Sequence, residues 1–177
     1  MRQPVIPALT LTLVLATLST TAFAKAPEPA KTIDPAIFYN GRWIEIGRRP
    51  MFITNRCVAG TTDYRRTGDL TVTVVDGCHR DTPAGKPVTL AGQGTIMDPG
   101  TNAKLRVRYN ALITWDYWVL DRADDYSWFI SADPNLKNLW IYTRTVPSPI
   151  LLKALMGRAK ALGYDTDKLE FPAPPIN

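Results

Sequence analysis

The stretch CVAGTTDYRRTGDLTVTVVDGC opens on Cys57 and closes on Cys78, the two cysteines of this 177-residue chain. Two thiols supply too few ligands for a zinc site, and the chain has a single histidine, His79, to add to them. The C-x-x-C spacing of a thiol–disulfide redox centre is absent. These residues therefore favour a structural disulfide over a metal site or a redox site.

The same stretch is typical of a β-hairpin. If Thr67 and Gly68 are the centre of its turn, Cys57 and Cys78 lie directly opposite each other on adjacent antiparallel strands, within reach of a disulfide. That register places valines opposite polar residues of the other strand. A bulge at Gly68 that shifts the pairing by one residue is the alternative.

Other catalytic chemistry has little support in the sequence. A lone histidine gives a weak basis for general-base catalysis, and the G-x-S-x-G, P-loop and H-E-x-x-H motifs are absent. The carboxylates of Asp116, Asp121, Asp124 and Asp125 fall at strand ends and turns, where aspartate caps backbone groups. We therefore expect no enzyme, no cofactor and no metal site.

The N-terminus predicts an extracytoplasmic protein. Residues 1–24 combine Arg2, a short apolar run and the small-residue pattern Ala22-Phe23-Ala24, which is typical of a cleaved signal peptide. Cleavage is expected after Ala24, and no cysteine near that point offers a thiol for a lipid anchor. The mature protein is expected to be periplasmic or secreted, where disulfides persist.

The net charge is +5, but the basic residues are scattered among apolar and acidic neighbours. Nucleic-acid binding requires a concentrated basic patch, so it is not expected. The basic residues, Arg48 and Arg49 among them, are predicted to lie on solvated faces, with attraction to an anionic lipid surface as the minor alternative. The sequence is compatible with a monomer or a homodimer.

The remainder reads as one domain over residues 36–172, between a flexible linker at 25–35 and a Pro-rich tail at 173–177. Short alternating segments separated by turn residues predict eight antiparallel strands, in an up-and-down barrel or a sandwich. The strands are expected at 42–49, 57–66, 69–78, 87–97, 103–111, 116–122, 127–133 and 138–145, with a possible short strand at 169–171.

One helix is predicted after the strands. Ser148 is a suitable N-cap, Pro149 suits the first position, and Gly163 suits the C-cap. An apolar stripe made by Leu151, Leu155, Ala159 and Leu162 predicts that the helix packs on the outside of the sheet.

Three motifs in this order resemble those of the lipocalins. NGRWIEIG is similar to the G-x-W motif, DDYSW to the T-D-Y motif, and IYTRT to the third motif with its basic residue. The bacterial lipocalins are most similar, through NAKLRVRY, DYWVLD, LWIYTRT, ALGYD and the cysteine pair. The resemblance implies an eight-stranded barrel open at one end, which is closed at the other by Gly41, Trp43 and Arg144, with the guanidinium across the indole.

Alternation along the strands then suggests which side chains face the interior. The candidate ligand contacts are Glu45, Leu105, Val107, Tyr109, Tyr117, Trp118, Val119, Trp140 and Tyr142, with the inward face of the sixth strand left open. Gly92 and Gly94 either leave volume in the barrel or mark a bend. The loop RPMFITN (49–55) is expected at the mouth.

The resemblance implies a carrier or scavenger of a fatty acid, a lysophospholipid or a similar amphiphile, with a role in envelope maintenance or stress response. One alternative is an enzyme acting on a hydrophobic substrate in the barrel, with Glu45 as the candidate group. Another is an envelope protein that acts through its surface, which an interior packed solid by side chains would favour.

Overall fold

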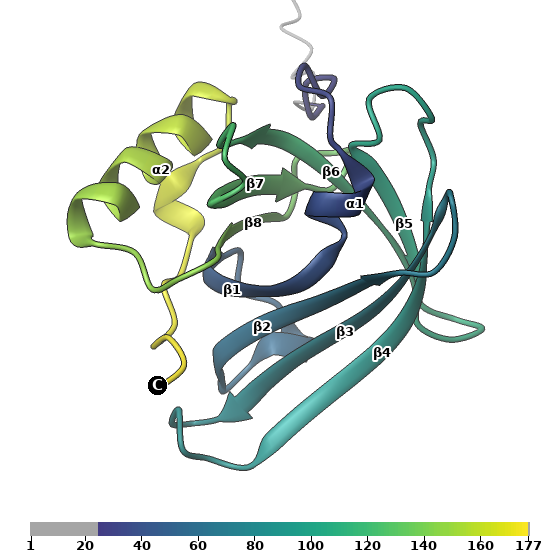
Figure 1. Ribbon diagram of the computed structural model, residues 1–177. Helices are drawn as coiled ribbons and strands as arrows, with labels where there is room; N and C mark the ends of the chain where they lie inside the picture. Colours follow the sequence, from purple (N-terminus) through teal and green to yellow (C-terminus); the bar gives the residue numbers. More distant parts are fainter. Residues whose placement is uncertain (1–24, 177) are drawn as a thin grey trace, which may run out of the picture.

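The computed structural model describes residues 25–176, so the predicted signal peptide lies outside the described residues. Each strand pairs with the next along the chain and β8 pairs with β1, which closes an antiparallel barrel (Figure 1). This confirms the predicted up-and-down barrel. The strands are β1 (Asn40–Arg48), β2 (Cys57–Arg66), β3 (Thr71–Arg80), β4 (Pro87–Ile96), β5 (Lys104–Arg108), β6 (Thr114–Arg122), β7 (Trp128–Ala132) and β8 (Leu139–Thr143).

The predicted helix is α2 (Pro149–Ala161), which lies outside the barrel beside β7 and β8 (Figure 1). The Ser148 side chain accepts a hydrogen bond from the backbone N–H of Leu151 at 3.2 Å, as an N-cap does. Leu155 and Ala159 are fully buried in an apolar cluster with residues of β7 and β8 such as Ile130. The apolar stripe therefore fixes the helix to the outer face of these strands.

The register of the β2–β3 hairpin differs from the sequence-based alignment. Tyr64 pairs with Val74 and Thr62 with Asp76, and the loop spans residues 67–70 rather than a two-residue turn. This register places Val72 and Val74 on the same inward face as Tyr64. The burial of these side chains determines the register, and a two-residue turn at Thr67 and Gly68 does not form. A slip by one residue would exchange the inner and outer faces of a strand.

The disulfide joins Cys57 and Cys78, although the two are not directly opposite. Cys57 pairs with Arg80, two residues beyond Cys78, and the register shifts between Val58 and Thr61. Ala59 in this interval has a φ of 53°, and the Cα atoms of the cysteines are 5.6 Å apart. The bulge therefore lies at the cysteine end of the hairpin, not at Gly68.

A short helix that the sequence analysis did not predict, α1 (Pro35–Phe38), closes one end of the barrel. Phe38 is buried and its ring centroid lies 4.8 Å from that of Phe129 and 5.3 Å from that of Trp43. The segment before α1 packs against the barrel as well, with Ile33 buried and hydrogen-bonded to Thr101. The segment predicted as a flexible linker is therefore held in place along part of its length.

The closing contact implied by the lipocalin resemblance is present. The Arg144 guanidinium lies 3.5 Å from the ring centroid of Trp43, whose side chain is 0% exposed. Arg144 also donates hydrogen bonds to the carbonyl oxygens of Arg42 and Ile37. Gly41 has a φ of +77°, a conformation that favours glycine, and this lets the chain turn beneath the arginine.

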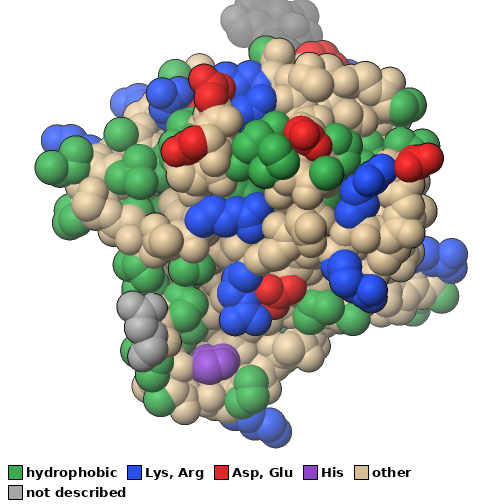
Figure 2. Space-filling view, in the orientation of Figure 1, with side chains coloured by type: hydrophobic (Ala, Val, Ile, Leu, Met, Phe, Trp, Pro, Cys, Tyr) green, Lys and Arg blue, Asp and Glu red, His purple; other side chains and the backbone are tan. Residues whose placement is uncertain are grey.

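The C-terminal segment after η2 (Thr166–Lys168) returns to the barrel wall. Glu170 forms an isolated antiparallel bridge with Arg48, so the predicted short strand at 169–171 is reduced to one bridging residue. Within residues 25–176, no helix combines the length and apolar character needed to cross a membrane. Figure 2 shows basic and acidic side chains interspersed over one face of the molecule rather than gathered in a single patch.

Candidate ligand-binding site

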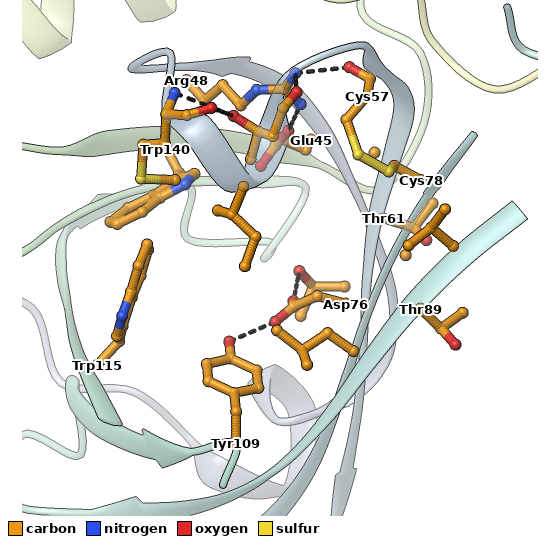
Figure 3. A pocket seen from close by; sticks show the side chains of 18 of the residues that line it. Glu45, Arg48, Cys57, Thr61, Asp76, Cys78, Thr89, Tyr109, Trp115 and Trp140 are labelled. Atoms are coloured by element: carbon orange, nitrogen blue, oxygen red, sulfur yellow. Dashed lines mark hydrogen bonds and ion pairs between the residues drawn. A yellow bond between two sulfur atoms is a disulfide. The ribbon is translucent and has the colours of Figure 1, made fainter. Parts of the chain in front are cut away.

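A cavity of about 250 Å³ occupies the half of the barrel opposite the α1 end. The loop that contains η1 (Phe52–Thr54) borders it, as the mouth prediction for residues 49–55 implies. Figure 3 shows side chains from several strands converging on this space. The lining residues are Glu45, Arg48, Met51, Ile53, Thr54, Cys57, Gly60, Thr61, Thr62, Asp76, Gly77, Cys78, Arg80, Val88, Thr89, Leu90, Tyr109, Ile113, Trp115, Tyr117, Trp140 and Tyr142.

One side of the cavity is aromatic. Trp140 and Trp115 face each other with ring centroids 6.1 Å apart (Figure 3). The ring centroid of Tyr117 lies 5.0 Å from that of Trp140. Leu90 and Val88 supply aliphatic surface from β4. Such a lining suits an apolar ligand body, with polar groups confined to a few positions.

The sequence-based candidates separate into three groups. Five of them line the cavity: Glu45, Tyr109, Tyr117, Trp140 and Tyr142. Leu105, Val107 and Val119 face inward but are buried in the packed core and do not line the cavity. Trp118 lies on the outer face of β6, where Lys104 Nζ is 3.9 Å from its ring centroid. An outward side chain cannot contact a ligand in the interior, so Trp118 is a correction to the candidate set.

The two glycines of β4 face the interior but leave no space there. A Cβ at Gly92 would lie 2.6 Å from Val107 and 2.9 Å from Tyr109, and a Cβ at Gly94 would lie 3.0 Å from Leu105. The missing Cβ atoms therefore accommodate the large side chains of the neighbouring strand. Of the two alternatives for these glycines, free volume is not observed, because Val107, Tyr109 and Leu105 occupy that space.

Arg48, predicted to be solvated, is instead 2% exposed and lines the cavity. The register between β1 and β8 shifts between Glu45 and Gly47, which is a bulge. The extra residue reverses the alternation, so positions 45 and 48 both face inward. Strict alternation would have placed Arg48 outside, which explains why the sequence analysis missed it.

The Arg48 guanidinium is held by four acceptors. Nη1 donates to Glu45 Oε1 at 2.5 Å, and Nε donates to Glu170 Oε1 at 2.7 Å. Nη2 donates to the carbonyl oxygens of Cys57 at 2.6 Å and Thr54 at 3.2 Å. Burial raises the pKa of Glu45, and the neighbouring Arg48 opposes that rise. Arg48 thus links β1 to Cys57 at the start of β2 and to Glu170 in the C-terminal segment.

A second polar group centres on Asp76, which the sequence analysis did not identify. Thr62 Oγ1 donates to Asp76 Oδ1 at 2.6 Å, and the Tyr109 hydroxyl donates to Asp76 Oδ2 at 2.5 Å (Figure 3). The hydroxyls of Tyr109 and Tyr117 are 2.9 Å apart, and Thr62 Oγ1 lies 3.4 Å from the Tyr142 hydroxyl oxygen. We call these five residues the Asp76 network.

The Asp76 network lies at the boundary between the cavity and the packed core. Its three tyrosines line the cavity and also belong to or pack against the core cluster. Burial is the main cause that raises the pKa of Asp76, and the hydrogen bonds from Thr62 and Tyr109 oppose it. Asp76 shares the strand parity of Val72 and Val74, which is the sequence signal that could have placed it inside.

No metal site is found within residues 25–176. In that part of the chain, no group of three or more His, Cys, Asp or Glu side chains lies close enough together to hold an ion. His79 contributes a ring nitrogen to a contact with the carbonyl oxygen of Pro83. The side chains that line the cavity offer hydrogen bonding, ion pairing and apolar contact.

Comparison with solved structures finds the same fold in other proteins. Insecticyanin from the tobacco hornworm Manduca sexta superposes with a TM-score of 0.63 at 20% identity, over 82% of each chain. Lobster apocrustacyanin A1 has a TM-score of 0.60 at 12% identity, over 89% of this chain and 94% of that one. The siderocalin Ex-FABP has a TM-score of 0.55 at 14% identity, over 78% and 95%.

At the level of sequence, a search of curated proteins gives no match. The profile of the lipocalin-like domain, in contrast, matches residues 36–174, which is nearly the whole described chain. The closed eight-stranded barrel, the Trp43–Arg144 contact at its closed end and the outer helix α2 agree with that match. This chain therefore belongs to the lipocalin-like domain family.

Proposed function

We propose that this protein is an extracytoplasmic carrier or scavenger that binds one small hydrophobic or amphiphilic ligand inside its barrel. The cavity of about 250 Å³ is the observation that carries the proposal. An interior packed solid by side chains would have favoured a protein that acts through its surface. The cavity in the half of the barrel opposite α1 supports binding instead.

The cavity size limits what is enclosed. A dry cavity of about 150 Å³ holds one benzene ring, so the space here suits a ring with a short substituent or part of an acyl chain. Each buried methylene contributes about 0.8 kcal/mol before the ordering costs of binding. A fatty acid, a lysophospholipid or a similar amphiphile would insert part of its chain and leave the remainder at the mouth.

Two further observations support the extracytoplasmic location and the ligand-binding role. The Cys57–Cys78 disulfide suits an oxidising compartment such as the periplasm or the extracellular space, in which a role in envelope maintenance or stress response would be placed. One structure of the same fold is described as a siderocalin that functions through dual ligand specificities, which supports ligand binding as a use of this barrel.

Binding is favoured over catalysis by the state of the candidate carboxylate. Glu45 is buried and the Arg48 guanidinium donates to it at 2.5 Å, so it is committed to an ion pair. A general base requires a carboxylate that is free to reach a substrate proton. Glu45 is therefore assigned a structural role in the cavity wall.

The direct test is to purify the protein under native conditions, extract it and identify any bound lipid by mass spectrometry. A fluorescent fatty acid should then bind with a stoichiometry of one and be displaced by the extracted ligand. Recovery of no lipid together with no binding of the fluorescent fatty acid would contradict the proposal.

A cavity-filling variant links binding to this space. Leu90→Trp places a larger side chain in the cavity, and the matched control Ala91→Trp adds the same side chain at the next, outward-facing and exposed position of β4. We expect Leu90→Trp to weaken binding of the fluorescent fatty acid by about tenfold or more, equivalent to at least 1.4 kcal/mol, and Ala91→Trp to leave it unchanged. Equal effects of the two variants would place the ligand elsewhere.

A further inference from the structure

The protons of the Asp76 network are all directed at the carboxylate or at one another. The Tyr109 hydroxyl donates to Asp76 Oδ2, so the 2.9 Å contact between the two tyrosines uses the proton of Tyr117. Thr62 donates its single hydroxyl proton to Asp76 Oδ1 at 2.6 Å, so its 3.4 Å contact uses the proton of Tyr142. Around an ionised Asp76, what remains for a ligand is lone pairs on oxygen atoms.

The cations beside the cavity do not change its preference for hydrogen-bond donors over acceptors. Among the described lining residues, Arg48 and Arg80 are the cations. Arg48 is paired with the carboxylates of Glu45 and Glu170, and Arg80 donates to the carbonyl oxygen of Asn55 at the mouth loop. The charge of the buried Arg48 is therefore already balanced by acids, and that of Arg80 is held at the mouth.

From this arrangement we propose that the Asp76 network is a subsite for a hydrogen-bond donor, so that the preferred ligand carries a primary ammonium or a hydroxyl group rather than a carboxylate at its inner end. This deepens the proposed function and rests on it. The observation that carries it is a carboxylate at the boundary of the cavity that accepts from two hydroxyl groups, each of which is in contact with a further tyrosine hydroxyl.

The preference runs against the net charge of the molecule. At +5 the whole chain attracts anions, so long-range electrostatics alone would favour a fatty-acid carboxylate over an amine. Inside the cavity a carboxylate beside Asp76 meets a like charge with no free donor of opposite charge. The indole N–H groups of Trp115 and Trp140 are neutral donors and cannot compensate a second negative charge. The net charge of the chain therefore predicts a preference for a carboxylate ligand, and Asp76 in the cavity predicts a preference for an ammonium or hydroxyl ligand.

The test uses four probes with the same ten-carbon chain: decylamine, decanol, decanoate and decyltrimethylammonium. Affinities are measured by displacement of a neutral fluorescent probe at about pH 8, because burial raises the pKa of Asp76 and the test needs its ionised form. We expect decylamine to bind about tenfold or more tightly than decanoate, with decanol between them. Decyltrimethylammonium has the charge but no N–H donor, and is expected to bind about tenfold more weakly than decylamine.

Two variants connect the preference to the network. Asp76→Asn removes the charge with little change of shape. Tyr117→Phe removes a hydroxyl that contacts Tyr109 and leaves Asp76 in place. Asp76→Asn should reduce the ratio of decylamine to decanoate affinity about tenfold, and Tyr117→Phe should reduce it less. If Asp76→Asn does not fold, the probe series on the unmodified protein and on Tyr117→Phe still decides the question.

The outcomes distinguish the two proposals. Decanoate binding as tightly as decylamine overturns the donor subsite and leaves the carrier function standing. Equal binding of decylamine and decyltrimethylammonium also overturns it, because charge alone would then account for recognition. Failure of all four probes and of the fluorescent probe to bind overturns both proposals.

Discussion

The two halves of the barrel interior are built from the same strands but differ in how the space is filled. In the half closed by α1, which we call the closed half, Trp43, Phe38 and Phe129 pack with ring centroids about 5 Å apart. In the half that holds the cavity, the open half, Glu45 follows Trp43 on the same face of β1 and borders empty space. Trp43 stabilises the fold, whereas Glu45, two residues further along the same strand, shapes the site.

The comparison teaches that packing and polarity change together along the barrel. Aromatic rings fill the closed half, and its basic residue, Arg144, lies across the Trp43 ring. In the open half the buried charges Arg48 and Glu45 neutralise each other, and Asp76 is held by hydroxyl groups. Substitutions in the closed half should therefore act on stability alone, whereas substitutions in the open half should act on stability, on binding or on pH dependence according to which polar group they remove.

The largest expected effect tests the closed half. Trp43→Ala removes a fully buried indole and its contact with Arg144, and we expect a loss of about 3–5 kcal/mol in the free energy of unfolding. Denaturant titration measures that loss, and a fluorescent fatty acid measures binding by the molecules that remain folded. A variant that melts normally but has lost its affinity would contradict the division between the halves.

The next effect tests the buried ion pair of the open half. Arg48→Met leaves Glu45 buried without its partner, and we expect a loss of about 3 kcal/mol or more in the free energy of unfolding. The double variant Arg48→Met with Glu45→Leu also removes the orphaned carboxylate and should recover most of the loss. A double variant as unstable as Arg48→Met alone would mean that the backbone contacts of Arg48 dominate.

The disulfide spans the wall of the open half, and its removal should be separable from binding. Cys57→Ser with Cys78→Ser opens a loop of 21 residues in sequence separation, which is worth about 3 kcal/mol in the chain-entropy model. We expect a lower melting temperature and, at a temperature where the variant is folded, retained binding of the fluorescent fatty acid. Loss of binding in the folded variant would show that the cavity wall needs the bridge.

The sequence predicted the regular features because local chemistry encodes them. Alternating apolar residues and turn-forming residues determined eight strands, and Ser148, Pro149 and an apolar stripe determined α2. In the site, Glu45, Tyr109 and Trp140 followed from alternation in the same way. Positions in register with a regular strand were thus accessible from the sequence.

Irregular features were not accessible in that way. The bulge between Glu45 and Gly47 reverses the alternation and turns Arg48 inward, and no residue pattern announces it. On β6, aromatic residues of both parities follow one another, so alternation could not reveal that Trp118 faces outward. Asp76 differs from these cases, since its parity with Val72 was readable and only its polar character argued against the interior.

The smallest expected effect concerns the pH dependence that Asp76 contributes to stability. Burial raises its pKa in the folded protein above the ordinary value of 3.8, so the ionised form is the one that burial disfavours. Its contribution to stability is therefore complete below the unfolded pKa and is lost as the pH rises through the folded pKa. The loss amounts to about 1.4 kcal/mol for each unit by which the pKa is raised.

Asp76→Asn isolates this contribution because asparagine does not titrate. The free energy of unfolding of the variant minus that of the unmodified protein should rise as the pH increases from about 4 through the folded pKa, and should then level off. Thr62, Tyr109 and Tyr117 surround Asp76 and stay neutral in this range. The charge of Asp76 also helps to raise the pKa of Glu45, so its removal lowers that pKa and changes the difference in the same direction. Asp81, whose pKa is lowered by Arg56, contributes equally to both proteins and cancels. A difference that falls with rising pH would mean that the hydroxyl groups stabilise the ionised carboxylate by more than its burial costs, so that Asp76 would stabilise the open half in its ionised form.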